Sequence, residues 1–316
     1  MDKKIKILMC SFPTGSRGPA TAYLNHKNAL NSSEKFEISE ITNEIISNFN
    51  EVSRYDVFWF SVRFDPNLYL FLKKNFPNKI FWMGPNVLFE KAEIGPSDEW
   101  EKWFVQNVTC DIYSNKADFY LERVRDFFSG SKKYHTLRNC IDLNEFKDVS
   151  FMNKDRPVDV LIYYKKRRID HQIEDLYPRL LKRLDNSKIS YDVINYGSYT
   201  REEYFKKLFT SKVCLWLSIE DYCSNAQLES MFLNVPVIGT QFNNTDVHNQ
   251  KLNVPASTID KKSWIKWQND MPDMFFERVE KFIKEEYDPT NMQCRNHILE
   301  NYSYETYVKN LEKVLE

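Results

Sequence analysis

Short apolar runs alternate with longer amphipathic segments along the whole chain. The runs DVFWFSV (56–62) and KIFWMG (79–84) are apolar almost throughout, which is typical of strands that a parallel sheet buries on both faces. Alternation of such strands with helices predicts a doubly wound α/β domain. In the first half of the chain we expect strands over Lys4–Met9, Asp56–Val62, Lys79–Gly84, Cys110–Ser114 and Tyr134–Arg138, and helices over Ala20–Leu30, Pro66–Asn75 and Asn115–Phe128.

The same pattern starts again after a polar segment, Asp148–Pro157, which we interpret as a linker. Two α/β domains are therefore expected, over residues 1–147 and 158–300, facing each other across a cleft. Ligands of such domains bind outside the carboxyl ends of the strands. In the second half we expect strands over Val158–Tyr164, Ser190–Asn195, Val213–Leu217 and Val235–Gly239, and helices over Glu174–Leu184, Glu202–Phe209, Met274–Glu286 and Tyr304–Glu316.

Composition and charge narrow the class of protein. The chain has 316 residues, of which 42% are hydrophobic and 28% charged, as in ordinary globular proteins. The 44 basic and 45 acidic residues almost cancel, which disfavours nucleic-acid binding through bulk charge, although a local basic patch stays possible. The six Cys form no CxxC pair, so we expect reduced thiols and a cytoplasmic protein. No apolar run reaches the ~18 residues of a transmembrane helix.

The most informative segment is LWLSIEDYCSNAQLESMFLNVPVIGT (215–240), which reads as strand, loop, helix, turn and strand. Ser224 and Gln227 have the spacing of a capping box at the start of the helix. Asn234 can take the left-handed conformation that ends a helix, and Pro236 prevents its continuation. The first amides of this helix, over residues 225–227, would then form an anion site at the carboxyl ends of the strands.

Two acidic residues accompany this helix. Glu229 lies in its first turns, where a carboxylate can accept two hydrogen bonds from a diol such as ribose. Asp221 precedes Glu229 by eight positions, on the loop that leads into the helix. The alternative interpretation is a surface acid and an acid that stabilises the positive helix end.

Asp221, Glu229, Ser218 and the run ESMFLNVPVIGT resemble the signature of family-4-type retaining glycosyltransferases of the GT-B fold. That signature is an acidic residue, seven residues, Glu, and then a run that ends in Gly-x-Pro-Val-Ile. Asp221 stands where the family usually has Glu, and Asn234 replaces the usual Gly. Three weaker resemblances occur in the family's order: a Gly-bearing acceptor-side loop at Gly15–Gly18, NCIDLNEF at 139–146, and the base-bordering segment YGSYTREEY at 196–204.

The resemblance implies roles for individual residues. Glu229 would bind the ribose, and Asp221 would contact the transferred sugar. The donor diphosphate would be held by the amides of Ser224, Asn225 and Ala226 and by the basic run Lys165, Lys166, Arg167 and Arg168, with Lys166 and Arg167 as the catalytic cations. Gly197 and Ser198 would border the base. On the acceptor side the resemblance implies Gly15, Arg17 and Gly18, with Asn86 in the region where the family often has a His.

The fold implied is GT-B, with two Rossmann-like domains and a C-terminal helix, 301–316, that packs back on the first domain. The activity implied is transfer, with retention, from a uridine- or guanosine-diphosphate sugar to a hydroxyl of a glycan, lipid-linked or small-molecule acceptor. The nucleotide sugar is a co-substrate, so no cofactor is expected, and without an Asp-x-Asp motif no metal is expected either. No GxGxxG follows the first strand, which argues against a dehydrogenase.

Two alternatives stay open from the sequence. One is a glycosyltransferase that modifies a DNA base. The basic run supports this alternative, and the near-zero net charge argues against it. The other is a GT-B protein that binds a nucleotide sugar without catalysis, because the His is missing and Asp221 replaces Glu. Among the aromatics, Trp59 and Trp82 are expected in the core, whereas Trp100 and Trp103 could line an acceptor cleft.

Overall fold

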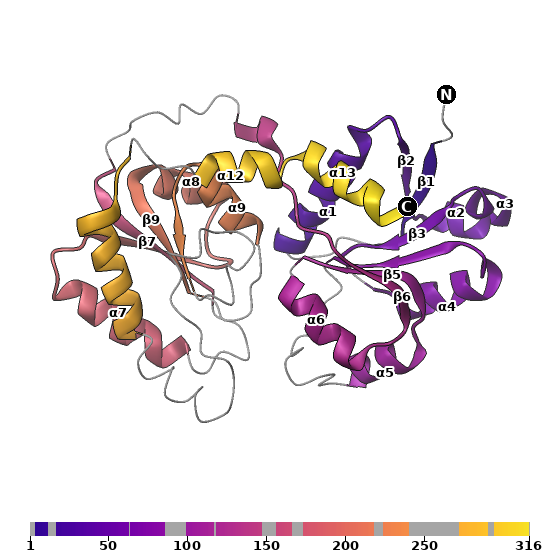
Figure 1. The fold of residues 1–316 in the computed structure, drawn as a ribbon, viewed down its shortest axis with the longest axis horizontal. Coiled ribbons are helices and arrows are strands. Elements are labelled where there is room, and N and C mark those ends of the chain that lie inside the picture. The colour runs from indigo at the N-terminus through magenta and orange to yellow at the C-terminus, as the bar shows by residue number, and fades with distance from the viewer. Residues whose placement is uncertain are drawn as a thin grey trace. The chain divides into compact units, whose positions relative to one another are not determined.

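The chain forms two compact units (Figure 1). The computed structural model describes residues 4–11, 17–62, 64–85, 99–116, 118–146, 156–165, 173–217, 224–239, 272–289 and 294–315. Unit 1 comprises Met1–Glu145 and Asn301–Glu316, and unit 2 comprises Phe146–Glu300. Each unit is a parallel sheet flanked by helices, so the predicted pair of doubly wound α/β domains is confirmed.

Unit 1 contains a six-stranded sheet with the order β2-β1-β3-β4-β5-β6, in which every neighbouring pair is parallel. Its strands are β1 (Ile5–Met9), β2 (Phe36–Glu40), β3 (Val57–Phe60), β4 (Ile80–Met83), β5 (Cys110–Asn115) and β6 (Ser131–Thr136). Its helices are α1 (Arg17–Asn31), α2 (Asn43–Ser47), α3 (Phe49–Ser53), α4 (Pro66–Asn75), α5 (Glu99–Asn107), α6 (Asp118–Phe127) and α13 (Tyr304–Leu315).

An aromatic stack fills one face of this sheet. The His26 ring lies between Tyr307 and Trp59, with centroids 5.1 and 5.7 Å away, and Trp59 stacks on Trp82 at 4.7 Å. Trp59 and Trp82 are fully buried, as predicted for core residues. Their indole N–H groups donate to the carbonyl of Gly84 and to Ser114 Oγ, at 2.6 and 2.7 Å, so both buried donors are satisfied.

Helix α13 completes this core from the far end of the chain. Its residues Tyr307, Val308, Leu311 and Val314 are buried in the same cluster as the strand residues of β1 and β3. In Figure 1 the yellow α13 lies beside the indigo α1, and the two helices are in contact. The face that α1 alone would leave open is thereby covered.

Unit 2 contains a four-stranded parallel sheet with the order β10-β9-β7-β8. Its strands are β7 (Val158–Tyr164), β8 (Tyr191–Asn195), β9 (Ser211–Leu217) and β10 (Val237–Ile238). Its helices are α7 (Ile173–Asp185), α8 (Arg201–Thr210), α9 (Asn225–Phe232), a helix over 272–281 that continues as a π-helical turn at Phe282–Glu286, and α12 (Cys294–Asn301).

Several sequence predictions differ from the structure, among them the strand expected over Tyr134–Arg138, which is β6 at Ser131–Thr136. Strand β2 was not predicted, because Phe36–Glu40 is an edge strand with exposed Glu residues and lacks the continuous apolar pattern of a buried strand. Helix α1 begins at Arg17, so Arg17 and Gly18 lie in its first turn and not in a loop. Strand β10 is shorter than predicted, because the amide of Val235 donates to the Ser230 carbonyl in the turn before it.

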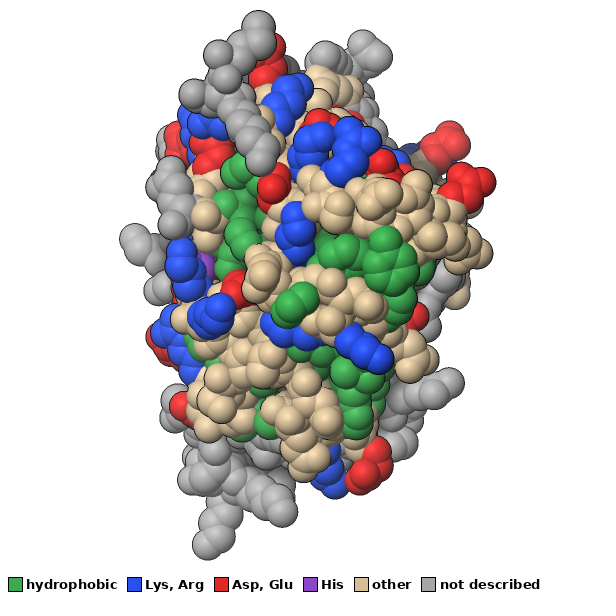
Figure 2. Space-filling view, turned by 90° about the vertical axis from the view of Figure 1, so that its right-hand side faces the viewer, with side chains coloured by type: hydrophobic (Ala, Val, Ile, Leu, Met, Phe, Trp, Pro, Cys, Tyr) green, Lys and Arg blue, Asp and Glu red, His purple; other side chains and the backbone are tan. Residues whose placement is uncertain are grey.

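Apolar and basic side chains are interspersed on the face shown in Figure 2. Large apolar side chains that are exposed in unit 1 include Leu24, Phe49 and Leu70. The described residues of this face therefore form no single basic field of the kind that binds nucleic acid through bulk charge. No helix in the described ranges combines the length and the apolar character that a membrane crossing requires.

Candidate functional site

The carboxyl edge of the unit 2 sheet is the natural place for a ligand. In the pairing register Tyr164 of β7 lies opposite Leu217 of β9 and Asn195 of β8, so these three strands end level with one another. The chain passes from β7 to β8 on one side and returns to β9 on the other side of β7. Strand order therefore reverses between β7 and β9, and α/β sheets bind ligands at such switch points.

Helix α9 starts at this edge and is capped as predicted. Ser224 is the N-cap, its hydroxyl accepts from the Gln227 amide at 3.3 Å, and the Ser224 amide donates to Gln227 Oε1 at 2.9 Å. The box uses the amides of Ser224 and Gln227, so the amide set expected for the diphosphate must be corrected to Asn225 and Ala226. Because the helix begins at Asn225, these two amides have no carbonyl partner within it.

The start of α9 is polar and buried. Asn225, Gln227 and Glu229 are 8%, 0% and 4% exposed. The side-chain oxygen Oδ1 of Asn225 has no hydrogen-bond partner among the described residues. Buried polar atoms are normally satisfied, so an unpaired one beside two free helix amides is a feature of a ligand site more than of a core.

Lys165 directly follows β7 and is the one member of the predicted basic run that the structure describes. It is only 8% exposed, and its amide donates to the Leu217 carbonyl at 3.0 Å, continuing the pairing with β9. Its Nζ lies 4.5 Å from the ring centroid of Tyr196. A buried cation is thereby held at the end of β7, with its backbone paired to β9 beside the switch point and its side chain against the end of β8.

The turn after β8 contains the two residues predicted to border the base. Ser198 donates its amide to the Asn195 carbonyl at 3.0 Å, and Gly197 has φ +85°. A positive φ at the third position is the signature of a type II turn, which favours glycine. The turn places Gly197 and Ser198 next to Tyr196, and thus close to Lys165.

Glu229 has a partner that the sequence prediction missed. Arg201, the first residue of α8, places Nη2 2.8 Å from Glu229 Oε1. The Tyr204 hydroxyl, one turn further along α8, donates to the Ala226 carbonyl at 2.6 Å. A cation in the first turn of a helix interacts unfavourably with the helix dipole. The position of Arg201 directly after the Thr200 cap could therefore have indicated that Arg201 pairs with an acidic residue outside α8.

An aromatic layer supports these elements from within the sheet. The Tyr163 ring stacks on Trp216 at 4.1 Å with an interplanar angle of 10°, and its hydroxyl lies 2.7 Å from that of Tyr199. Tyr204 packs edge-on against Tyr163. The ends of β7 and β9 and the start of α8 therefore share one rigid contact set.

Several predicted residues lie outside the described ranges: Asp221, Lys166, Arg167, Arg168, Gly15 and Asn86. The structure brings together Lys165 with the turn of Gly197 and Ser198, and Ser224, Asn225, Ala226 and Glu229 with the start of α8. Arg17 and Gly18 belong to unit 1, at the start of α1.

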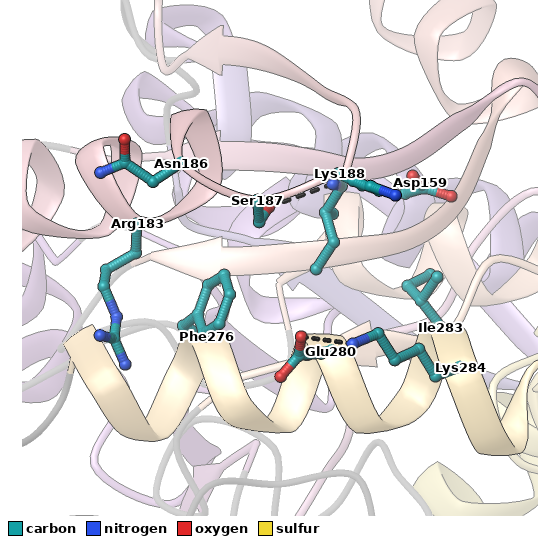
Figure 3. Close-up of a pocket in the computed structure, with 10 residues that line it drawn as sticks. Asp159, Arg183, Asn186, Ser187, Lys188, Phe276, Glu280, Ile283 and Lys284 are labelled. Carbon is teal, nitrogen blue, oxygen red and sulfur yellow. Dashed lines mark hydrogen bonds and ion pairs between the residues drawn. The ribbon is translucent and has the colours of Figure 1, made fainter.

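A surface groove of about 560 Å³ lies elsewhere in unit 2 (Figure 3). It is lined by Asp159 and Lys188 and by Phe276, Glu280 and Lys284 of the helix that faces them. Glu280 and Lys284 pair with each other at 2.6 Å. Asp159 is the second residue of β7, so this groove is at the amino edge of the sheet, opposite the candidate site. No group of His, Cys, Asp and Glu that could hold a metal occurs within the described part of the chain.

Comparison with solved structures places the fold. The lipopolysaccharide outer core galactosyltransferase WaaB matches with a TM-score of 0.61 at 12% identity, over 99% of both chains. The N-terminal domain of Candida albicans trehalose-6-phosphate phosphatase matches with a TM-score of 0.60 at 11% identity, over 100% of this chain and 97% of that one. A chain of the GtfA/B complex matches with a TM-score of 0.58 at 9% identity, over 86% of this chain, which spans 59% of the length of that one.

No protein-family model and no curated protein sequence matches this sequence significantly. The structural matches nonetheless cover both units, and the chain has the GT-B fold that the sequence resemblance implied.

Proposed function

We propose that this protein is a glycosyltransferase that binds a nucleotide-diphosphate sugar at the carboxyl edge of unit 2. The observation that carries the proposal is the capped start of α9, with the amides of Asn225 and Ala226 and the buried Glu229 at the switch point of the sheet. The shared GT-B fold with the galactosyltransferase WaaB supports it.

In the reaction we propose, the bond between the sugar and the diphosphate breaks, a hydroxyl of the acceptor bonds to the same sugar carbon, and the proton of that hydroxyl passes to the leaving diphosphate. Negative charge grows on the leaving diphosphate, where the amides of Asn225 and Ala226 and the amine of Lys165 stabilise it. Lys166, Arg167 and Arg168 follow Lys165 in the sequence and add positive charge there. Asp221 contacts the transferred sugar, and Glu229 accepts hydrogen bonds from the ribose.

The finer features of the proposal rest on the sequence resemblance. They are retention of configuration, a uridine or guanosine nucleotide, transfer without a divalent metal, and a hydroxyl acceptor bound on the side of Gly15, Arg17, Gly18 and Asn86. We also place the reaction in the cytoplasm, because the cysteines have no pairing pattern in the sequence. NMR of the product anomer, with and without a chelator, tests retention and metal independence together.

Titration calorimetry with UDP-, GDP-, ADP- and dTDP-sugars tests donor binding, and Glu229→Gln tests the site. The variant keeps the size of the side chain but removes the negative charge that accepts hydrogen bonds from the ribose hydroxyls. A hydrogen bond to a charged group contributes about 1.5–3 kcal/mol, so donor affinity should fall roughly 10- to 150-fold. The control is Glu202→Gln, an exposed acid of α8, which should bind like the wild type.

Unchanged donor affinity in Glu229→Gln would contradict the site. Donor binding without hydrolysis or transfer to any acceptor would indicate a sugar-nucleotide binding protein instead. Transfer to DNA but not to glycans, with a steep loss of activity as salt rises, would favour the nucleic-acid acceptor.

A further inference from the structure

Arg201 forms an ion pair with Glu229. Its side chain is 40% exposed, whereas that of Glu229 is 6% exposed, and the two meet at 2.8 Å. The helix dipole at the start of α8 disfavours a cation at this position. The pairing with Glu229 therefore accounts for the orientation of Arg201 better than its own helix does.

Two further contacts fix this arrangement. The Arg201 guanidinium lies over the ring of Phe205, one turn along α8, at 4.9 Å. Tyr204, next to Phe205, donates its hydroxyl hydrogen to the carbonyl of Ala226. The amide of Ala226 is one of the two that we assign to the diphosphate. The start of α8 is thus joined to α9 both at the proposed diphosphate end and at the proposed ribose end.

We infer that Arg201 is a positioning residue for the donor, which keeps Glu229 ionised and aimed at the ribose. This inference rests on the proposed function. A carboxylate as buried as Glu229 is disfavoured in its charged form unless a cation or several hydrogen bonds compensate. A protonated carboxyl accepts fewer hydrogen bonds. Loss of Arg201 therefore weakens donor binding through Glu229, although Arg201 itself need not touch the donor.

Two titratable groups packed near α9, Tyr204 and Cys214, keep one protonation state near neutral pH. Burial raises the pKa of Tyr204 on α8 well above its usual value, and the charge of Glu229 adds to this effect. Cys214 of β9 is next to Ser230 of α9, and burial raises its pKa to about 12. Neither Tyr204 nor Cys214 therefore gives donor binding a pH dependence near neutral pH.

The test is donor affinity as a function of pH, between about pH 5.5 and 8.5, for Arg201→Ala, Arg201→Gln and Arg201→Lys. In Arg201→Ala and Arg201→Gln we expect affinity to fall at least about tenfold at the acidic end and to recover as pH rises, because a buried carboxylate that has lost its guanidinium takes up a proton more readily. Arg201→Lys restores the charge and should recover most of the affinity at every pH. Lys206→Ala, an exposed cation of the same helix, should match the wild type.

Wild-type affinity in Arg201→Ala at every pH overturns the inference. So does a loss that is independent of pH and that Arg201→Lys does not restore, since it indicates a structural role. In both cases the proposed function stands if the wild type binds donor and Glu229→Gln binds it more weakly. Absence of donor binding by the wild type overturns the proposed function and this inference together. If Arg201→Ala does not fold, Arg201→Gln and Arg201→Lys decide.

Discussion

The two units each bury an ionisable side chain, and they treat it in opposite ways. His26 in unit 1 is fully buried and stacks between Tyr307 and Trp59, and burial lowers its pKa. Glu229 in unit 2 is nearly as buried but meets a guanidinium at 2.8 Å. Unit 1 thus holds its group as a neutral ring, whereas unit 2 pairs its group with a cation.

The comparison distinguishes a buried group that only fills space in a core from a buried group that serves a candidate binding site. A neutral imidazole fills space in an aromatic stack and needs only that it stay uncharged. A buried carboxylate costs free energy unless it is paired, and its pairing here is at the end of two helices beside free amides. Changes at His26 should therefore alter stability alone, while changes around α9 should alter donor affinity as well.

The largest effect is expected from acid on His26. Burial lowers the pKa of His26 from 6.5 to about 3. The unfolded chain takes up a proton below pH 6.5 and the folded chain does not, so the stability that His26 contributes is present above pH 6.5 and is lost as pH falls toward 3. The loss approaches about 1.4 kcal/mol per pH unit and amounts to about 2.3 kcal/mol between pH 6.5 and 4.5.

Urea unfolding of His26→Phe at both pH values measures this loss. The Phe ring keeps the stack but cannot bind a proton, so the stability of the variant should fall with acid by about 2.3 kcal/mol less than that of the wild type. Tyr307→Phe keeps both the ring and His26, and should retain the wild-type acid sensitivity. Equal acid sensitivity of His26→Phe and wild type would show that His26 is not held neutral.

A smaller effect is expected at Gly197 in the turn after β8. An added Cβ would meet no atom within 4 Å, so the cost of Gly197→Ala comes only from the backbone, at φ +85°. For an L-residue this conformation costs about 1–2 kcal/mol. Urea unfolding should show this loss for Ala and a smaller one for Gly197→Asn, since Asn tolerates positive φ. Equal losses would indicate a side-chain contact instead.

The smallest effect on stability is expected at the cap of α9. Ser224→Ala removes the hydroxyl that accepts from the Gln227 amide and should destabilise the protein by about 1 kcal/mol. Donor affinity should fall too, because the start of α9 frays. Thr42→Ala removes the equivalent cap of α2 in unit 1, where the hydroxyl accepts from the Ile45 amide at 3.2 Å, and should leave donor affinity unchanged. The same fall in donor affinity for both variants would separate α9 from the site.

Much of the fold could be predicted because buried parallel strands have an unambiguous pattern. The run Val57–Phe60 is buried at every position, and Val158–Tyr164 has the predicted limits. The capping box of α9 and the left-handed Asn234, with φ 59°, follow from local chemistry and are confirmed. Strand β2 was missed because it is a half-exposed edge strand. Its apolar and polar residues therefore lack the continuous apolar pattern that identifies a strand buried on both faces.

The site was less predictable, because its central contact joins two helices. Nothing in the order of residues places Arg201 against Glu229, which lies 28 positions away. The sequence indicated the capping box of α9. It did not indicate that the Ser224 amide donates to Gln227 Oε1 and is therefore not available to a ligand. The placement of Lys165 over Tyr196 likewise depends on how β7 and β8 pair.

Unit 1 is assembled from segments that leave the ribosome at very different times. Strands β1 to β6 and α1 are translated first, but Tyr307, Leu311 and Val314 of α13 follow only after all of Phe146–Glu300. At 5–20 residues per second, translating that intervening stretch takes roughly 10–30 seconds. During this time the aromatic surface around His26 and Trp59 lacks the cover that α13 provides. Unit 1 therefore cannot complete its core until unit 2 has been translated.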